Sequence, residues 1–114
     1  YCHPEVASIG RTEKKLKEEA IPYKKGVFPF RASGRARASG ESEGMVKVLS
    51  GEYGQILGVH IAGPGATEIL SGPMVGASNE LTVENFARTM HAHPTLSESV
   101  MEAMAAALGE AIHI

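Results

Sequence analysis

The sequence is short of residues on which several classes of protein depend. Cys2 is the only cysteine among 114 residues, which excludes a disulfide within the chain and a cysteine-rich zinc site. Any chemistry that needs two thiols must therefore be completed by another polypeptide segment. Few cysteines are typical of a reducing compartment, and we expect a cytoplasmic protein.

Long apolar runs and charge of one sign are also missing. No apolar stretch approaches the roughly 20 residues needed to cross a bilayer, so no membrane partner is expected. The formal net charge is only −2, and the dispersed basic residues form no stripe that would neutralise the phosphates of a nucleic acid. The first residues lack the basic and apolar regions of a targeting signal. A start at Tyr1 rather than at methionine indicates a segment of something longer.

What is present is typical of a single globular domain. The chain is 43% hydrophobic and 21% charged, near the averages of folded domains and far from those of disordered chains. Its length is close to the commonest domain size and suffices to bury a core without metals or disulfides. We therefore predict one domain over residues 1–114.

Strand patterns dominate the first half of the chain. Residues 5–9 and 23–30 are predicted strands, and the prolines at the ends of the latter mark either an edge strand or the margins of a strand. Residues 45–49 and 56–62 are apolar and partly β-branched, and the short glycine-containing segment between them predicts a hairpin. The stretch 31–44 is rich in Gly, Ser, Arg and Ala without periodicity, so we predict the longest loop there.

Three short helices are expected before the C-terminal region. Thr12 and Thr82 are predicted N-caps. In the first helix, Leu16 and Ala20 are the inward candidates. Gly72-Pro73 should break or kink the second, since proline lacks the amide donor and clashes with the preceding turn. The predicted helices cover residues 13–20, 66–71 and 82–90.

The last helix has the clearest local signal. Thr95-Leu96-Ser97-Glu98 has the form of a capping box, and apolar residues then recur at helical spacing. Alanines on the other faces, including residues 105–107, are small enough to admit another helix. Strands early and helices late predict an α+β fold, a two-layer sandwich of a mainly antiparallel sheet with helices. The periodic apolar residues are Val100, Met101, Met104, Leu108, Ala111 and Ile112.

The segment before this helix carries residues suited to proton transfer. His93 is of the type whose ordinary pKa, about 6.5, suits a general base. Glu98, in the first turn, could fold back toward His93 and hold its far ring nitrogen, which fixes the tautomer and stabilises the imidazolium. The helix N-terminus disfavours that imidazolium, whereas the carboxylate favours it. The spacing therefore permits a His–Glu pair and leaves the pKa of its histidine open.

Two other interpretations fit the same spacing. Glu98 could simply accept a hydrogen bond from the Thr95 amide, a cap that contributes about 1 kcal/mol. His91 and His93 could share one face of an extended segment and bind a metal, but no third ligand has an evident spacing.

Four segments together resemble one known family. Residues 91–98 (HAHPTLSE) resemble the C-terminal active-site motif of dihydrolipoamide dehydrogenases, which are flavin-dependent disulfide reductases. Residues 3–13 (HPEVASIGRTE) resemble the first strand and helix of that family's interface domain, residues 28–36 its next strand and loop, and residues 58–68 (GVHIAGPGATE) its strand-to-helix junction. The segments follow the family's order and cover essentially the whole chain.

The resemblance implies a homodimeric flavoenzyme in which this C-terminal dimerisation domain makes much of the subunit contact. In that family, electrons pass from dihydrolipoamide through a redox disulfide to FAD and then to NAD. The histidine at the position of His93 accepts the proton of the substrate thiol, and the glutamate at the position of Glu98 orients and charges it. The pair faces the disulfide of the opposite subunit.

The resemblance also assigns supporting residues and partners. His91, Pro94 and Thr95 are predicted to support the site, and the peptide before Pro94 is often cis in this superfamily. The same surface resembles the docking site for the subunit-binding domain of a 2-oxoacid dehydrogenase acyltransferase. The cofactor domains and the redox cysteines are absent, so this chain alone is expected to bind neither cofactor and to be inactive. Gly72-Pro73 also interrupts a helix that is expected to be longer in relatives.

Two alternatives stay open at this point. A glutathione- or trypanothione-type reductase is the first, although Leu96 and the leading His91-Ala92 favour the lipoamide branch. The second is a purely structural dimerisation or docking module, in which His93 and Glu98 are incidental.

Overall fold

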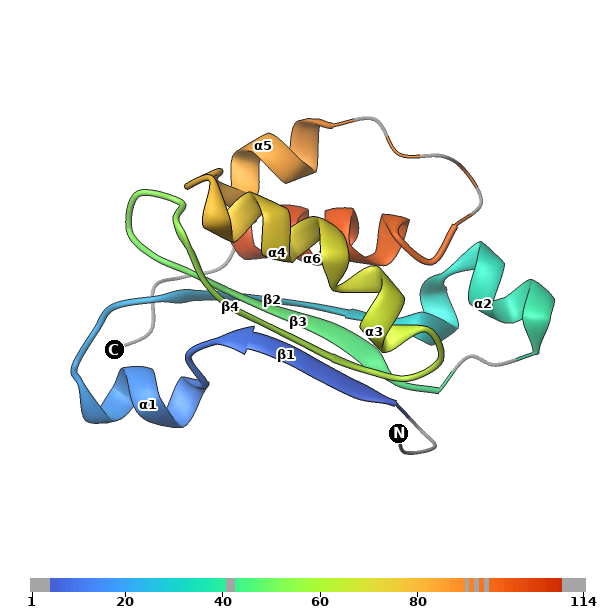
Figure 1. The fold of residues 1–114 in the computed structure, drawn as a ribbon, viewed down its shortest axis with the longest axis horizontal. Helices are drawn as coiled ribbons and strands as arrows, with labels where there is room; N and C mark the ends of the chain where they lie inside the picture. The colour runs from blue at the N-terminus through green and yellow to red at the C-terminus, as the bar shows by residue number, and fades with distance from the viewer. Residues whose placement is uncertain (1–4, 41–42, 90, 92, 94, 110–114) are drawn as a thin grey trace.

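Four antiparallel strands form one sheet in the spatial order β1, β4, β3, β2 (Figure 1). The computed structural model describes residues 5–40, 43–89, 91, 93 and 95–109. All four strands were predicted from the sequence, and β2 lies at an edge of the sheet, one of the two readings that its flanking prolines allowed. Their bounds are β1 (Val6–Gly10), β2 (Lys24–Pro29), β3 (Met45–Ser50) and β4 (Ile56–Ala62).

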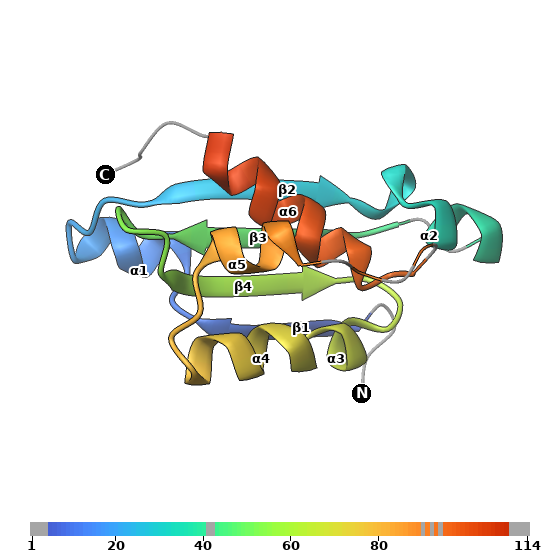
Figure 2. The ribbon, with the colours of Figure 1, turned by 90° about the horizontal axis from the view of Figure 1, so that it is seen from above.

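Helices cover one face of this sheet, which confirms the α+β, two-layer class. Figure 1 shows α4, α5 and α6 above the strands and α1 below one end of them. Seen from above in Figure 2, α6 crosses β2 and β3, while α3 and α4 run beside β1. The helices are α1 (Glu13–Glu18), α2 (Gly34–Ser39), α3 (Ala66–Ile69), α4 (Ser71–Ser78), α5 (Val83–Arg88) and α6 (Glu98–Gly109), with a 3-10 turn η1 (Phe30–Ala32).

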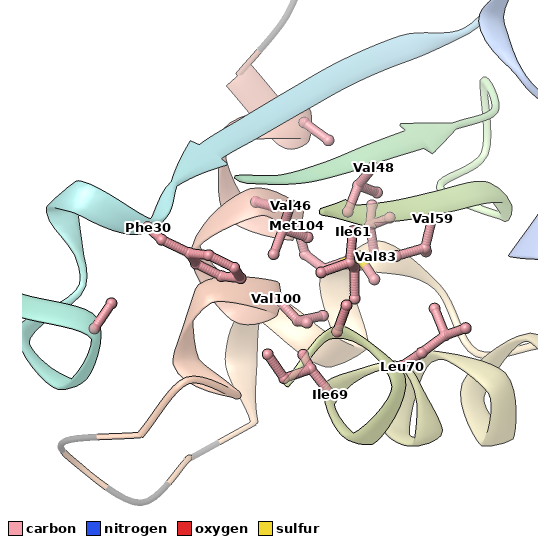
Figure 3. Close-up of a cluster of buried hydrophobic side chains, with 14 residues drawn as sticks. Phe30, Val46, Val48, Val59, Ile61, Ile69, Leu70, Val83, Val100 and Met104 are labelled. Atoms are coloured by element: carbon pink, nitrogen blue, oxygen red, sulfur yellow. The ribbon is translucent and has the colours of Figure 1, made fainter. Parts of the chain in front are cut away.

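The main core lies between the sheet and α6. Alternate residues of the two central strands point toward the helices, as the period of two along a strand requires. Figure 3 shows these side chains meeting α3, α5 and α6. Each fully buried aliphatic side chain contributes roughly 1.5–3 kcal/mol, so this cluster holds α6 on the sheet. Its labelled members are Phe30, Val46, Val48, Val59, Ile61, Ile69, Leu70, Val83, Val100 and Met104.

A bulge at the hairpin end of β4 makes both faces of the sheet apolar there. Leu49 pairs with Gly58 and Ser50 with Ile56, which leaves Leu57 as the extra residue. Ile56 therefore packs against the main core, whereas Leu57 packs on the opposite face. There it joins a second cluster of Leu16, Tyr23 and Leu49, through which α1 packs on the sheet.

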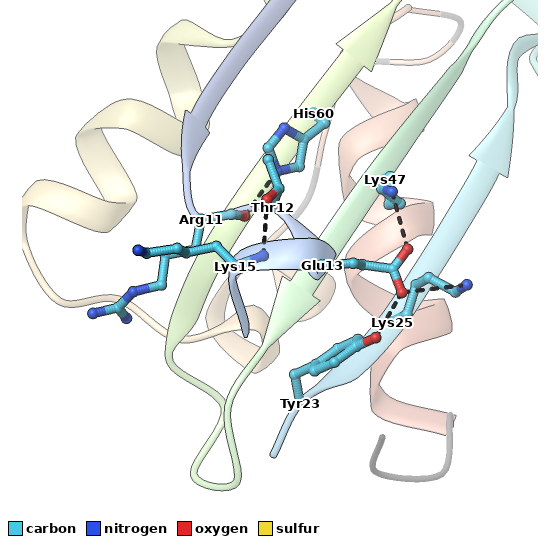
Figure 4. A network of polar contacts seen from close by, with 8 residues as sticks. All are labelled: Arg11, Thr12, Glu13, Lys15, Tyr23, Lys25, Lys47 and His60. Carbon is cyan, nitrogen blue, oxygen red and sulfur yellow. Dashed lines mark hydrogen bonds and ion pairs between the residues drawn. The ribbon is translucent and has the colours of Figure 1, made fainter. Parts of the chain in front are cut away.

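A polar network fastens α1 to the same outer face (Figure 4). The carboxylate of Glu13 accepts hydrogen bonds from the Tyr23 hydroxyl at 2.7 Å and from Lys47 Nζ at 3.0 Å, and Lys25 Nζ lies 3.7 Å away. Thr12 caps the helix as predicted, its side chain accepting from the Lys15 amide at 3.1 Å. The predicted inward position of Ala20 is wrong, because α1 ends at Glu18 and Ala20 is an exposed turn residue with φ +54°.

The predicted loop over residues 31–44 is also partly wrong. It contains η1 and α2, and the Ser33 side chain caps α2 by accepting from the Ala36 amide at 3.3 Å. Gly40 then ends α2 with φ +75°, a conformation that glycine adopts without strain. Glycine and serine here mark the two ends of a short helix, which a composition-based interpretation takes for a loop.

The break predicted near Gly72-Pro73 falls at Leu70, three residues before the proline. α3 ends at Ile69, and α4 begins at Ser71 with Pro73 in its first turn, where the missing amide costs no hydrogen bond within the helix. The predicted interruption is therefore present, but a second helix follows it. The third predicted helix is confirmed as α5, with Thr82 and Asn85 forming a capping box.

The buried face of α6 differs from the predicted one. Leu108 is 41% exposed, whereas Ala103 and Ala107 are fully buried together with Val100 and Met104. A Cβ at Gly26 of β2 would overlap the backbones of Ala103 and Ala107, so the strand approaches the helix through its small residues. Ala111 and Ile112 lie outside the described residues. Among the residues that are described, no helix is long and apolar enough to span a membrane.

Candidate active site

The first residue of α6 contacts the histidine that precedes the helix. His93 Nδ1 donates to the carboxylate of Glu98, with both oxygens 3.0 Å away. The histidine side chain is 77% exposed, whereas that of Glu98 is 23% exposed. The spacing of the two residues permitted this contact without deciding between it and the helix cap. With the proton of a neutral ring on Nδ1, the lone pair is on Nε2, which is then the ring atom able to accept a proton.

Glu98 also closes the start of its own helix. Its Oε1 accepts a hydrogen bond of 2.8 Å from the amide of Thr95, three residues earlier, which is the contact that the acidic residue makes in a capping box. The cap and the His–Glu contact, which were alternatives in the sequence, therefore occur together. The backbone amide fixes the carboxylate, and the fixed carboxylate orients the ring.

These contacts favour the charged form of Glu98. The hydrogen bond from the Thr95 amide is the largest cause that lowers the pKa of the Glu98 carboxyl, and the hydrogen bond from His93 is the next. Both stabilise the carboxylate over the neutral acid. A carboxylate at this position stabilises an imidazolium when Nε2 of the ring takes up a proton.

The other predicted site residues have different surroundings. The Nδ1 atom of His91 donates to the Thr89 carbonyl at 2.9 Å, so this ring is turned back to its own loop. Thr95 acts through the amide that holds Glu98, and Pro94 lies outside the described residues. In the described ranges, no group of three or more His, Cys, Asp or Glu side chains is arranged to hold a metal ion.

A hollow of about 300 Å³ opens beside the pair. Phe28, Ser33 and Gly34 line it from the end of β2 and the start of α2, and Glu102 lines it from the next turn of α6. None of these four was singled out as a site residue. The capping potential of Ser33 was the available signal, and the loop interpretation of residues 31–44 concealed it.

The structure is thus a small α+β domain with an exposed histidine held against a glutamate at the start of its last helix. The chain is a member of the family described as "Pyridine nucleotide-disulphide oxidoreductase, dimerisation domain", which it matches over residues 1–104.

Curated relatives name a more specific group within that family. The chain is 47% identical to the mitochondrial dihydrolipoyl dehydrogenase of Sus scrofa, over 99% of its own length and 23% of the relative's. It is 46% identical to dihydrolipoyl dehydrogenase 1, mitochondrial, of Arabidopsis thaliana, over 100% of its length and again 23% of the relative's. The chain thus spans about a quarter of the length of these relatives.

Solved structures agree with the fold. LpdA from Mycobacterium tuberculosis superposes with a TM-score of 0.86 at 27% sequence identity, over 92% of this chain and 23% of that one.

The predicted cytoplasmic location is contradicted by the curated relatives, which are named as mitochondrial. That prediction depended on the low cysteine count, which is typical of proteins in a reducing environment. A reducing environment does not identify one compartment.

Proposed function

We propose that residues 1–114 form the C-terminal dimerisation domain of a homodimeric dihydrolipoamide dehydrogenase and supply the His93–Glu98 pair to the opposite subunit. The observation that carries the proposal is the exposed His93 ring, whose Nδ1 donates to a carboxylate fixed by a backbone amide. A carboxylate fixed in this way holds the ring in one tautomer and stabilises its protonated form.

In the proposed reaction, Nε2 of His93 accepts the proton of a dihydrolipoamide thiol. The thiolate that results is the nucleophile of thiol–disulfide exchange. Glu98 stabilises the imidazolium formed in that step and keeps the ring in one tautomer. The Thr95 amide holds Glu98 in place.

FAD and NAD would take up the electrons in the other domains of the parent enzyme. No residue of this chain is assigned to holding either cofactor. The thiol substrate, both cofactors and an acyltransferase subunit-binding domain as partner are parts of the proposal that depend on the family and its dihydrolipoyl dehydrogenase members.

The helical layer is the proposed subunit contact. On α4, Met74 is 49% and Val75 is 62% exposed, and Leu108 of α6 is 41% exposed. Alanines at 105 and 106 are also at least partly accessible on α6. Apolar side chains gathered on one layer are typical of surfaces that a partner covers.

The test is His93→Gln in the parent flavoenzyme. Loss of general-base catalysis should slow flavin reduction by dihydrolipoamide by ~100-fold or more, measured by stopped-flow absorbance. His60→Gln is the matched control, because His60 lies on the central strand β4 and its Nε2 donates to the Arg11 carbonyl at 2.9 Å. An unchanged rate in His93→Gln would remove the catalytic assignment.

A further inference from the structure

Glu5 joins two parts of the chain that lie 60 residues apart. It directly precedes β1, and its carbonyl accepts a hydrogen bond of 2.8 Å from the Gly63 amide. Its carboxylate accepts from the Gly65 amide at 3.1 Å and from the amide and the hydroxyl of Thr67 at 3.4 and 3.0 Å. The backbone of Glu5 thus holds the start of the turn that leads from β4 into α3, and its side chain holds the end of that turn.

The turn needs an external partner of this kind. Gly63 and Gly65 have φ of +135° and +73°, which L side chains rarely adopt. Gly65 is also the N-cap of α3, and glycine has no side chain to accept from the first amides of the helix. Glu5 accepts from the amide of Thr67, at the second helical position, and so performs the capping from another strand.

The segment that carries the proposed His93–Glu98 pair packs against this turn. A methyl group at Gly65 would lie 3.4 Å from Leu96 Cδ1, so the Leu96 side chain rests directly above the turn. Leu96 also packs against the core cluster that contains Ala66 and Ile69 of α3. Figure 1 shows the start of α3 and the start of α6 at the same end of the sheet.

Leu96 in turn locates the start of α6. Its carbonyl accepts from the Ser99 amide at 2.9 Å in the first turn, and it lies between Thr95, which donates to Glu98, and Glu98 itself. The described polar contact of the His93 ring is with Glu98. The place of the ring therefore depends on the place of Leu96.

We propose that Glu5 is a positioning residue for the reaction, acting through the turn at residues 63–67 and Leu96 to hold the Thr95–Glu98–His93 arrangement. The inference rests on the proposed function, because it concerns the geometry of that same pair. Glu5 does not touch the reacting atoms. Its effect is on the alignment of the base, where an error of about 1 Å can cost up to ~100-fold in rate.

The experiment compares Glu5→Ala, His93→Gln and the double variant in the parent flavoenzyme. We expect Glu5→Ala to slow flavin reduction by dihydrolipoamide by about 10-fold or more, with a changed pH profile for that step. Electron transfer from NADH to an artificial one-electron acceptor bypasses the thiol and should be unchanged. Adding Glu5→Ala to His93→Gln should cause little further loss, because both variants impair one unit.

Glu68→Gln is the matched control, an exposed carboxylate on α3 that should leave both rates unchanged. If Glu5→Ala loses its flavin, Thr67→Val carries the test, because it removes only the hydroxyl that donates to Glu5; we then expect a loss of about 2- to 3-fold in the thiol step.

Equal losses in the thiol step and in the artificial reaction would overturn the inference, since they would indicate general destabilisation. A slow His93→Gln enzyme beside a normal Glu5→Ala enzyme would overturn the positioning role and leave the proposed function standing. A normal His93→Gln enzyme would overturn both.

Discussion

His93 donates through Nδ1 to both carboxylate oxygens of Glu98 at 3.0 Å, across the start of α6. The same carboxylate accepts from the Thr95 amide, so helix capping and ring orientation depend on one side chain. Such a carboxylate cannot be removed without loosening the helix start, and the predictions below separate the two effects.

The charge of Glu98 should matter more to the thiol step than its shape does. Glu98→Gln retains a carbonyl oxygen that can accept from Thr95 and His93 but removes the charge that stabilises an imidazolium. We expect flavin reduction by dihydrolipoamide in the parent enzyme to slow by about 10-fold or more. Glu102→Gln, one turn later beside the same hollow, should change the rate by less than about 3-fold. A Glu98→Gln enzyme with full activity would contradict the proposed pair.

The lowered pKa of Glu13 predicts how the free energy of unfolding responds to acid. Partial burial raises the pKa of Glu13, but hydrogen bonds from Tyr23 and Lys47 outweigh it and lower the pKa to about 2 from 4.5. A lowered pKa stabilises the fold above pH 4.5, and that contribution is lost as the pH falls from about 4.5 to about 2. After discounting for its partial exposure, we expect the contribution to be on the order of 1–2 kcal/mol.

The measurement is urea unfolding of the 114-residue chain at pH 7 and pH 3. Glu13→Gln should lower the free energy of unfolding at pH 7 and reduce its dependence on pH in the acid range. Glu19→Gln is the control, because Glu19 pairs only at the surface with Arg11, at 3.2 Å, and such pairs contribute about 0–1 kcal/mol. Equal acid sensitivity in Glu13→Gln and in the unsubstituted 114-residue chain would refute the stabilising role of the Glu13 carboxylate.

The contact of Gly26 with α6 predicts an unusually costly alanine substitution. A Cβ at Gly26 would overlap the Ala103 carbonyl and the Ala107 backbone, which cannot move aside as a flexible side chain does. We expect Gly26→Ala to reduce the free energy of unfolding by about 1–3 kcal/mol or more. Gly72→Ala should be neutral or stabilising by up to about 1 kcal/mol, because its Cβ would meet only Phe86 at 4.0 Å inside a helix. Thermal unfolding of both variants decides between these outcomes.

The exposed residues of α4 predict a surface for self-association. Val75→Glu places a charge on the helical layer and should raise the dissociation constant of the dimer by about 10-fold or more. Val6→Glu introduces the same charge on β1, where Val6 is 70% exposed, and should leave association intact. Sedimentation of the 114-residue chain over a range of concentrations tests this; monomer alone at high concentration would count against a dimer through the helices.

Local signals in the sequence were sufficient for most of the secondary structure and for the proposed pair. Apolar, partly β-branched runs on either side of a short glycine-containing segment located β3 and β4. Thr12 and Thr82 marked helix starts because a side-chain oxygen satisfies free amides. The spacing of His93 and Glu98 permitted their contact because a carboxylate in the first turn of a helix can reach back to residues just before the helix start. The prediction of a loop over residues 31–44 was wrong because glycines and serines together outnumber the apolar residues there, which hides α2.

Tertiary structure decided what depends on contacts between distant segments. Sequence spacing could not show that Gly26 admits α6, that the bulge at Leu57 seats a second cluster under α1, or that Glu5 caps a helix more than 60 residues away. Each of these is a contact between groups whose proximity is set by packing and not by the period of a helix or a strand. The sequence alone determined which residue types are available for the proposed chemistry, and the packing of α6 on the sheet decided where their side chains lie.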